Sequence, residues 1–390
     1  MEVGQTYKVS IIDEDNIGNG IAKINDFVVF VKNGLKDDKL EIEITKVNKR
    51  FANAIITKII NPSKNRTFSK CKYYESCGGC AFLHTTYHNE RTIKHNYLEK
   101  LFETKIEYLP ILNEYNYRNK VTLHVKDGKV GFYNENTHDL CEIDSCLLLD
   151  NLINEKIKEI KRFDLSKISE IMIRVINNKT MISVKSSEDD INIKNIKCDS
   201  LYINDKFIKG EEYLIDEVGE YKFCVYPESF YQVNKDIMIK IYKKAYELIK
   251  KSESLLDLYC GIGTIGIWMH DKFDHIKGIE INKSAIDAAN INKELNNINN
   301  IEFECNDAKN TLAHFDTIIV DPPRSGLSVH VLTHLLYSEA KQIVYISCNP
   351  NTLKRDLLFL SKYEPKYFGC ADMFPRTKHI EMICLLELKG

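Results

Sequence analysis

The second half of the chain alternates between short apolar runs and helix-like stretches, and this alternation constrains the fold more than any other sequence feature. The apolar runs after Pro227 are SLLDLYCG, HIKGIEI, IEFECN, DTIIVDPP and QIVYISCN. Amphipathic stretches such as NKSAIDAANINKELNN lie between them. Parallel strands are joined by helical crossovers and are buried on both faces. We therefore predict an α/β fold over residues 226–390, with a doubly wound, Rossmann-like sheet.

The first part of the chain is rich in strands and predicts two further domains. Five short β-branched runs, separated by Gly, Asn and Asp turns, occupy residues 1–60. They favour a small barrel of the oligonucleotide-binding (OB) type, with a barrel that binds no ligand as the alternative. A cysteine-rich segment follows, and strands then return around one helix, NLINEKIKEIKR. We expect residues 61–225 to form a small α+β central domain.

The composition excludes a membrane protein and a disulfide scaffold. The chain has 390 residues, 44% of them hydrophobic, and a formal net charge of −2. No apolar run approaches the ~18–20 residues that span a bilayer, and the amino terminus shows no secretion signal. We expect a cytoplasmic protein with no membrane partner and no obligate protein partner. The twelve cysteines of such a chain indicate metal binding or catalysis for some of them.

A glycine loop after the first apolar run predicts a cofactor site. In DLYCGIGTIGI, Gly261 and Gly263 follow a strand and precede a helix, where the backbone turns tightly and approaches a ligand. The next strand ends at Glu280, where an acid binds ribose hydroxyls in Rossmann domains. A nicotinamide dinucleotide and S-adenosylmethionine both fit these features. The acid before the loop, Asp257, together with the later VDPPR, favours S-adenosylmethionine.

The run VYISCNP places Cys348 at the carboxyl end of the fifth strand, on the edge of the sheet where ligands bind. Methyl transfer to nitrogen or oxygen needs no cysteine, and Arg324 in VDPPR disfavours an amine acceptor. The C5 carbon of a pyrimidine is a poor nucleophile, and thiolate addition to C6 activates it. A base must then remove the C5 proton. Glu381, in the stretch DMFPRTKHIEMICLLE, is the candidate base.

Four motifs in this order resemble the RNA uracil-C5 methyltransferase family: DLYCGIGTIGI, VDPPRSGL, YISCNP and DMFPRTKHIE. The resemblance implies that Cys348 is the nucleophile and that Glu381 is the base. The upstream SFYQVN also resembles a family motif, and its Gln contacts the cofactor. Asn306 or Asp307 is then expected near the adenine. The residues that we expect to bind S-adenosylmethionine are Gln232, Tyr259, Gly261, Gly263, Thr264, Glu280 and Asp321.

A set of four cysteines predicts a metal centre in the central domain. CKYYESCGGC supplies Cys71, Cys77 and Cys80, and EIDSCLLLD supplies Cys146. Four thiolates bind either zinc or an iron–sulfur cluster, and the spacing alone leaves both open. The pattern resembles the 4Fe–4S motif of many family members, which implies a 4Fe–4S cluster with zinc as the alternative. Cys141 is a rival fourth ligand, but only Cys146 matches the family pattern.

Several features indicate an RNA partner, since a neutral total charge is compatible with a local basic groove. The N-terminal region resembles a TRAM domain, an OB-type RNA-binding module. A uridine in folded RNA must be flipped out to reach the thiolate and the methyl donor, and we expect Phe230 to stack on it. The candidate phosphate contacts are Lys32, Lys36, Lys39, Lys46, Lys49, Arg50, Arg118 and Lys120.

The combination of a TRAM-like barrel, four cysteines and a catalytic domain resembles the ribosomal-RNA branch of the family. It implies an enzyme that forms 5-methyluridine in 23S rRNA. Two alternatives stay open. One is the same C5 methylation on a uridine of the tRNA T-loop, and the other is a non-catalytic RNA-binding iron–sulfur protein.

Overall fold

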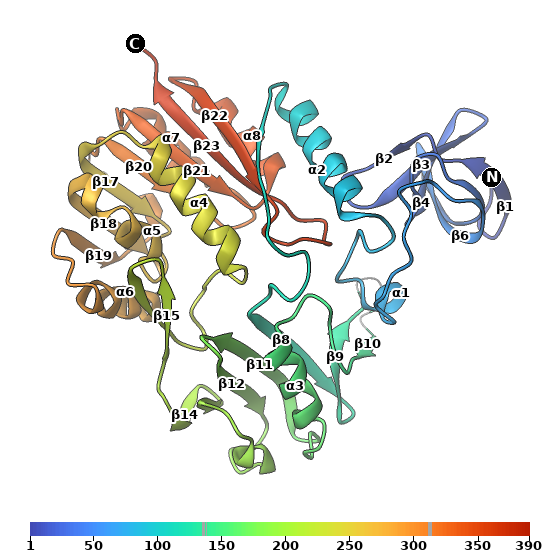
Figure 1. The fold of residues 1–390 in the computed structure, drawn as a ribbon. Coiled ribbons are helices and arrows are strands. Elements are labelled where there is room, and N and C mark those ends of the chain that lie inside the picture. Colours follow the sequence, from blue (N-terminus) through green and yellow to red (C-terminus); the bar gives the residue numbers. More distant parts are fainter. Residues whose placement is uncertain (135–136, 138, 311–313) are drawn as a thin grey trace. The chain divides into compact units, whose positions relative to one another are not determined.

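The computed structural model describes residues 1–134, 137, 139–310 and 314–390 (Figure 1). The chain divides into two compact units, each considered by itself. The first unit contains residues 1–104, 133–141 and 374–379, and the second contains residues 105–132, 142–373 and 380–390. Both units are therefore built from separate stretches of sequence.

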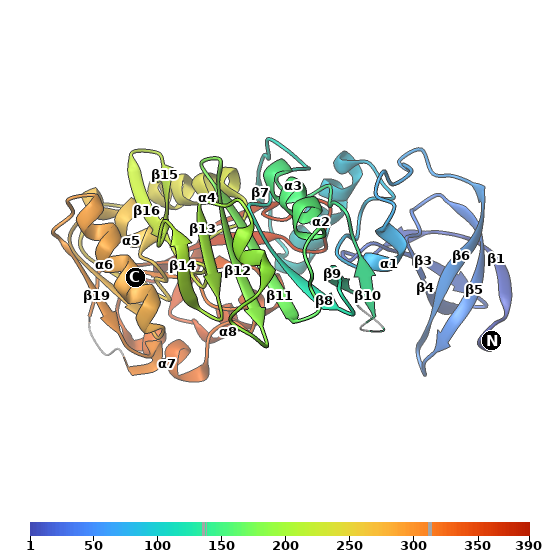
Figure 2. The same cartoon turned by 90° about the horizontal axis from the view of Figure 1, so that it is seen from below.

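The first unit begins with a six-stranded barrel-like sheet, drawn in dark blue in Figures 1 and 2. The strand order is β1-β5-β6-β4-β3-β2, and Val29, Val31, Ile42 and Ile44 lie in its fully buried core. The sequence predicted five of these strands, and the short β2 is the addition. The elements are β1 (Thr6–Ser10), β2 (Asp13–Glu14), β3 (Asn19–Ile24), β4 (Phe27–Lys32), β5 (Lys39–Val47), β6 (Phe51–Asn61), α1 (Tyr74–Cys77) and α2 (Tyr87–Phe102).

Buried charges join helix α2 to the segment 374–379 within the first unit. Glu90 is fully buried on α2 and accepts hydrogen bonds from the Lys94 ammonium at 2.8 Å and from the Arg376 main-chain N–H at 2.8 Å. The Arg376 guanidinium also donates to Glu90 at 3.0 Å. Buried charges are costly unless they are paired and hydrogen-bonded, so this cluster fixes the segment against the helix.

The second unit contains a central sheet with the order β9-β8-β11-β12-β13-β14, a β15–β16 hairpin and an eight-stranded sheet. Helix α3 packs on β11. The strands are β8 (Lys120–Lys126), β9 (Lys129–Tyr133), β11 (Ile168–Ile176), β12 (Lys179–Ser186), β13 (Ser200–Ile203), β14 (Lys206–Gly210), β15 (Leu214–Val218) and β16 (Tyr221–Val225). The remaining elements here are α3 (Asn151–Ile160), η1 (Asn192–Asn195) and β10 (Leu140–Glu142), within which the chain passes from one unit to the other.

The eight-stranded sheet has the order β19-β18-β17-β20-β21-β23-β22-β7 (Figure 1, yellow to red except for β7). Strands β17 to β21 are mutually parallel, which confirms the predicted parallel sheet, whereas β23 is antiparallel to both of its neighbours. The strand order reverses between β17 and β20, where ligands bind in open α/β sheets. The strands are β7 (Glu107–Leu109), β17 (Ser252–Leu258), β18 (Phe273–Glu280), β19 (Ile301–Cys305), β20 (Thr317–Val320), β21 (Gln342–Ser347), β22 (Tyr363–Ala371) and β23 (Glu381–Leu388).

Helices connect these strands, as the sequence pattern predicted. They are α4 (Lys235–Leu248), α5 (Thr264–Trp268), α6 (Lys283–Leu295), α7 (Val329–Tyr337) and α8 (Pro350–Phe359), with short turns η2 (His270–Lys272) and η3 (Ala308–Asn310). Within the described part of the chain, none of the helices combines the length and the apolar character that crossing a bilayer demands.

Candidate active site

The glycine loop between β17 and α5 has a backbone that few residue types adopt. Gly261 and Gly263 have φ angles of 54° and 82°, and Tyr259 has a φ of 66°. A Cβ on Gly263 would lie 2.5 Å from the Phe303 ring, whereas a Cβ on Gly261 would meet open space. A positive φ is strained for an aromatic residue, and such strain is concentrated at functional sites. The loop is therefore shaped for the close approach of a ligand at Gly261.

Asp257 lies fully buried at the end of β17, beneath this loop. Its Oδ2 accepts a hydrogen bond from the Gly266 N–H at 3.0 Å, but its Oδ1 has no hydrogen-bond partner among the described residues. The pKa of Asp257 is raised to about 8, mainly by burial; the Gly266 hydrogen bond lowers it, and the charges of Asp321 and Glu280 contribute to the rise. An orphaned buried carboxylate oxygen costs free energy unless a ligand satisfies it, and a cation would do so.

The predicted cofactor residues of the sheet lie along neighbouring strand ends. Glu280 ends β18, and its side chain accepts a hydrogen bond from the Asn282 N–H at 2.9 Å. Thr264 begins α5, with its Oγ1 2.9 Å from the Tyr242 hydroxyl. Burial raises the pKa of Tyr259 to about 12, so this phenol stays protonated at neutral pH. The acidic strand ends and the open glycine loop fit a ligand with a positive centre and a ribose, such as S-adenosylmethionine.

Gln232 lies elsewhere, in the segment 226–234, which has no regular secondary structure and joins β16 to α4. Its carbonyl oxygen accepts a hydrogen bond from the Asn119 side chain at 3.3 Å. Phe230 of the same segment is 73% exposed, as a residue that stacks on a base must be. Lys120, a candidate phosphate contact, donates its ammonium to the Pro227 carbonyl at 3.3 Å.

The register of two neighbouring strands places Cys348 beside Glu381. Strands β21 and β23 pair antiparallel, with Ser347 opposite Met382. Cys348 is the residue after Ser347, and Glu381 is the residue before Met382. The two side chains therefore start from directly opposed positions at the end of the ladder, where Cα atoms are ~4.5–5.5 Å apart.

The electrostatics of this pair raise the pKa values of both groups. The pKa of Cys348 is raised to about 11, mainly by burial and then by the charges of Glu381 and Asp321, whereas the exposed Arg324 lowers it. Burial also raises the pKa of Glu381 well above its ordinary value, followed by the charge of Asp321. The pKa of Asp321 rises to about 7 for the same reason. Strongly perturbed pKa values at one edge of a sheet are typical of functional sites.

Helix α8 fixes the two loops that flank the pair. Asn349 caps the helix, with Pro350 in its first turn, and donates its side-chain amide to the Arg324 carbonyl at 3.0 Å. The fully buried Asp356 accepts hydrogen bonds from the Leu327 N–H at 2.8 Å and from the Tyr345 hydroxyl at 2.7 Å. Our sequence reasoning missed both of these supporting residues. The Asn-Pro pair after an apolar strand was the available signal, since it marks a helix start.

The candidate metal ligands are divided between the units. Cys71, Cys77 and Cys80 belong to the first unit and are half-buried, whereas Cys146 belongs to the second. Among the described residues, no three His, Cys, Asp or Glu side chains gather as a metal-binding group. The rival ligand Cys141 lies in the first unit, with its Sγ 3.3 Å from the Ser76 Oγ. The four-cysteine cluster is therefore not confirmed, and no chemical step is derived through it.

The six basic residues proposed on the barrel are all exposed in the first unit, as phosphate contacts require: Lys32, Lys36, Lys39, Lys46, Lys49 and Arg50.

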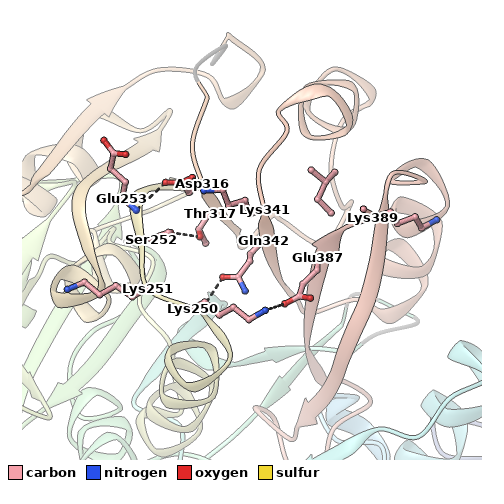
Figure 3. A pocket seen from close by; sticks show the side chains of 12 residues that line it. Lys250, Lys251, Ser252, Glu253, Asp316, Thr317, Lys341, Gln342, Glu387 and Lys389 are labelled. Carbon is pink, nitrogen blue, oxygen red and sulfur yellow. Dashed lines mark hydrogen bonds and ion pairs between the residues drawn. The ribbon is translucent and has the colours of Figure 1, made fainter.

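A pocket of about 590 Å³ lies at the opposite, amino-terminal ends of β17, β20 and β21 (Figure 3). Two of its lysines have acidic partners: Lys341 pairs with Asp316 at 2.7 Å, and Lys250 with Glu387 at 2.7 Å. This pocket lies at the opposite end of strand β21 from Cys348. Its lining contains no glycine loop and no cysteine nucleophile. We therefore place the candidate active site at the other edge of the sheet.

Comparison with known proteins identifies the family of the chain. The family model "tRNA (Uracil-5-)-methyltransferase" matches residues 167–312 and 304–389, and the TRAM domain model matches residues 1–57. An "Uncharacterized RNA methyltransferase" of Staphylococcus aureus strain MSSA476 is 32% identical, with 97% of each chain covered. A protein of the same description from Clostridium acetobutylicum is 33% identical over 98% of this chain and 96% of its own.

A solved structure extends the likeness to the whole fold. The crystal structure of Pyrococcus abyssi tRNA (uracil-54, C5)-methyltransferase in complex with S-adenosyl-L-homocysteine matches with a TM-score of 0.84 and 26% identity, covering 97% of this chain and 99% of that one. Fold and site thus define an S-adenosylmethionine-dependent RNA methyltransferase with an N-terminal TRAM domain. The chain belongs to the RNA uracil-5-methyltransferase family.

Proposed function

We propose that this protein methylates C5 of a specific, flipped-out uridine in 23S rRNA, with Cys348 as nucleophile and Glu381 as base. The observation that carries the proposal is the register of β21 and β23, which sets these two residues opposite each other at the carboxyl edge of the sheet. A nucleophile and a base must act on adjacent carbons of one pyrimidine ring, and this juxtaposition suits that requirement.

The residues divide the reaction into addition, proton removal and elimination. The Cys348 thiolate forms a bond to C6, which places negative charge on the ring and makes C5 nucleophilic. Bound S-adenosylmethionine supplies the methyl group as an electrophile. Glu381 in its ionised form then takes the C5 proton, and the electron pair of the C5–H bond expels the Cys348 sulfur from C6. The aromatic ring is restored and the thiolate is regenerated.

Both groups must lose a proton before they can act, because their pKa values are raised in the protein alone. The neighbouring Arg324 lowers both pKa values, and its charge is the chain's own contribution to this activation. Asp257, Asp321 and Glu280 are proposed to face the cofactor, with Gly261, Gly263, Tyr259 and Thr264 shaping its binding loop and Gln232 contacting it from the segment 226–234.

The same chemistry on tRNA is the second candidate. The Pyrococcus abyssi protein that matches almost the whole chain is a tRNA (uracil-54, C5)-methyltransferase by name. The overall architecture is therefore shared with a tRNA enzyme, and support for rRNA comes from the motif pattern alone.

The decisive experiment offers tritiated S-adenosylmethionine together with either 23S rRNA or tRNA, both lacking modifications. The expected result is 5-methyluridine in 23S rRNA and none with Cys348→Ala. Product in tRNA alone moves the substrate to tRNA and keeps the mechanism. Absence of methyl transfer to either RNA by protein that still binds S-adenosyl-L-homocysteine contradicts the catalytic proposal and favours the non-catalytic RNA-binding protein.

We also propose that Cys71, Cys77, Cys80 and Cys146 hold a 4Fe–4S cluster, with zinc as the alternative. The support is the family-like spacing and four soft thiolate donors. Protein purified without air should contain iron and acid-labile sulfide and should absorb visible light. Cys146→Ser should lose the iron and sulfide together with this absorbance. Cys141→Ser is the matched control, because its thiol neighbours the same segment. Retention of the cluster in Cys146→Ser with loss in Cys141→Ser contradicts the assignment.

A further inference from the structure

The segment 226–234 carries two residues of the proposed site but has no secondary structure to satisfy its backbone. It holds Phe230, proposed to stack on the flipped base, and Gln232, proposed to contact the cofactor. A buried or half-buried carbonyl without a partner costs free energy, so a segment of this kind needs donors from elsewhere. The source of those donors decides how firmly Phe230 and Gln232 are positioned.

Arg174, in the central strand β11, supplies the strongest of these donors. One guanidinium nitrogen donates to the Tyr226 carbonyl at 2.8 Å, and the other donates to the Ser229 carbonyl at 2.8 Å. The side chain therefore bridges the residues just before Phe230. Hydrogen bonds from a charged donor are about twice as strong as neutral ones, and two of them from a planar group also fix an orientation.

Two neighbours extend the same set of donors along the segment. Lys120 lies opposite Arg174 in the β8–β11 pairing, and its ammonium reaches the Pro227 carbonyl at 3.3 Å. Asn119 precedes it and holds the other side of Phe230, through its side chain to the Gln232 carbonyl at 3.3 Å and its N–H to the Val233 carbonyl at 3.0 Å. The central sheet thus binds main-chain carbonyls both before and after Phe230.

The cost of this arrangement argues that it has a purpose beyond stability. Arg174 is only 1% exposed, and among the described residues its guanidinium forms no ion pair and its Nε has no hydrogen-bond partner. A buried charge without a carboxylate is expensive, and an apolar side chain of similar volume is often the more stable choice at such a position. The charge instead fixes the positions of the Tyr226 and Ser229 carbonyls, which lie on either side of Pro227 and Glu228.

Side chains of the segment are anchored from a second direction. Asp216 of β15 is buried and accepts hydrogen bonds from the Tyr231 hydroxyl at 2.7 Å and from the Lys235 ammonium at 2.6 Å. Tyr231 lies between Phe230 and Gln232 in the chain and is itself buried. The side chains of Phe230 and Gln232, on either side of it, therefore do not point into this core, and Phe230 is exposed.

We propose that Arg174 is a positioning residue, which holds the segment 226–234 so that Gln232 meets the cofactor and Phe230 meets the target base. The proposal rests on the proposed function for these two contacts. Arg174 itself lies behind the segment and is almost inaccessible to solvent, so it acts through the backbone rather than on substrate.

A double-mutant cycle on cofactor binding tests the proposal on the full-length protein. The probe is S-adenosyl-L-homocysteine, titrated calorimetrically into wild type, Arg174→Met, Gln232→Ala and the double variant. Methionine keeps an apolar stem without donors. Arg174→Lys keeps the charge but lacks the fork that reaches two carbonyls, and it serves if Arg174→Met does not fold. Glu170→Gln on the same strand, with its side chain 40% exposed, is the matched control.

We expect Arg174→Met to weaken binding about tenfold, Arg174→Lys to fall between it and wild type, and Glu170→Gln to match wild type. In the Gln232→Ala background, removal of Arg174 should cost less than about twofold, since Arg174 acts through Gln232. A full additional loss in that background, or wild-type affinity in folded Arg174→Met and Arg174→Lys, overturns the proposal.

Methyl-transfer kinetics on the accepted RNA give a second readout that a merely structural role would not move. In Arg174→Met, the KM values for RNA and for S-adenosylmethionine should rise by a larger factor than kcat falls, because Cys348 and Glu381 are unchanged. A fall in kcat at unchanged KM contradicts the positioning role. If wild type transfers no methyl group, the proposed function fails, while the binding cycle still decides the role of Arg174.

Discussion

The two edges of the eight-stranded sheet treat their acidic residues in opposite ways. At the carboxyl edge, Asp257 and Glu381 are buried and Asp321 is half-buried, and all three have raised pKa values. At the amino edge, Asp316 and Glu387 are half-buried and pair with lysines, and these hydrogen bonds lower their pKa values. The sheet thus raises the pKa values of the carboxyl groups at one edge and lowers those at the other.

The difference separates residues kept for chemistry from residues kept for solubility. An ion pair at the surface is worth only ~0.2–1 kcal/mol and is screened by salt. A buried carboxyl without a counter-charge is costly and persists where a ligand or a reaction needs it. On this basis we interpret the pocket of the amino edge, shown in Figure 3, as ordinary surface, and the strained glycine loop stays the candidate cofactor site.

The largest expected effect comes from removing the base at the carboxyl edge. In Glu381→Gln the side chain keeps its shape but cannot accept the C5 proton, so elimination of Cys348 stops. We expect turnover to fall at least ~10³-fold, with a covalent protein–RNA adduct that survives denaturing electrophoresis. The double variant Cys348→Ala/Glu381→Gln should form no adduct. Wild-type turnover in Glu381→Gln would falsify the assignment of the base.

The next effect is a pH-dependent preference for a charged cofactor. S-adenosylmethionine carries a sulfonium cation, and S-adenosyl-L-homocysteine carries a neutral thioether. Asp321 and Asp257 titrate at pKa values of about 7 and about 8, so the edge gains negative charge as pH rises from 6 to 9. Calorimetry should show the affinity ratio shifting toward S-adenosylmethionine over this range, less so in Asp257→Asn. A ratio independent of pH contradicts the prediction.

Stability should respond to pH through Asp257 in the protein without cofactor. Its folded pKa of about 8 exceeds the ordinary value of 3.8, so the folded state retains a proton that the unfolded state has lost. Its contribution to stability is complete below pH ~4 and is lost as pH rises toward ~8, with a slope of up to ~1.4 kcal/mol per pH unit. Urea unfolding of Asp257→Asn should remove this slope.

The control for that experiment is Asp274→Asn, which makes the same change at an exposed position on β18. It should retain the slope of wild type. Equal slopes in wild type and Asp257→Asn would show that Asp257 is ionised in the folded protein throughout this range.

The smallest effect is expected at the amino edge. Lys341→Ala removes the partner of Asp316, but the lysine side chain is 73% exposed. The free energy of unfolding should fall by no more than ~0.5–1 kcal/mol, and the difference should shrink in high salt. Methyl-transfer rates should not change. A loss of activity in Lys341→Ala would show that the two edges are coupled.

The sequence predicted the strand ends of the site well because parallel strands have a simple rule. Apolar runs that stop at Asp257, Asp321 and Cys348 place these residues at one edge whatever the details of packing. The position of Glu381 opposite Cys348 was harder to predict. Nothing in the alternation of strands and helices specifies that β23 inserts antiparallel between β21 and β22, so the mechanism and the resemblance indicated Glu381 as the base but not its place opposite Cys348.

Arg174 shows what local patterns cannot predict. A charged residue in the run ISEIMIRVI is an anomaly, but the sequence cannot distinguish a solvated residue from one that binds carbonyls 52 and 55 residues away. The hydrogen bond from Lys120 to the Pro227 carbonyl was missed for the same reason. Both depend on contacts across a long sequence separation, whereas strand ends and helix caps are set by near neighbours.

The buried pairing of Glu90 with Arg376 has a consequence for how the protein is made. Domains are generally completed in their order of synthesis, amino-terminal first. Here Arg376 is translated 286 residues after Glu90, a delay of about 15–60 s on the ribosome. During that interval Glu90 on helix α2 lacks its Arg376 partner, because Arg376 is translated only after strands β17 to β22. The first unit to be translated is thus among the last parts of the molecule to be finished.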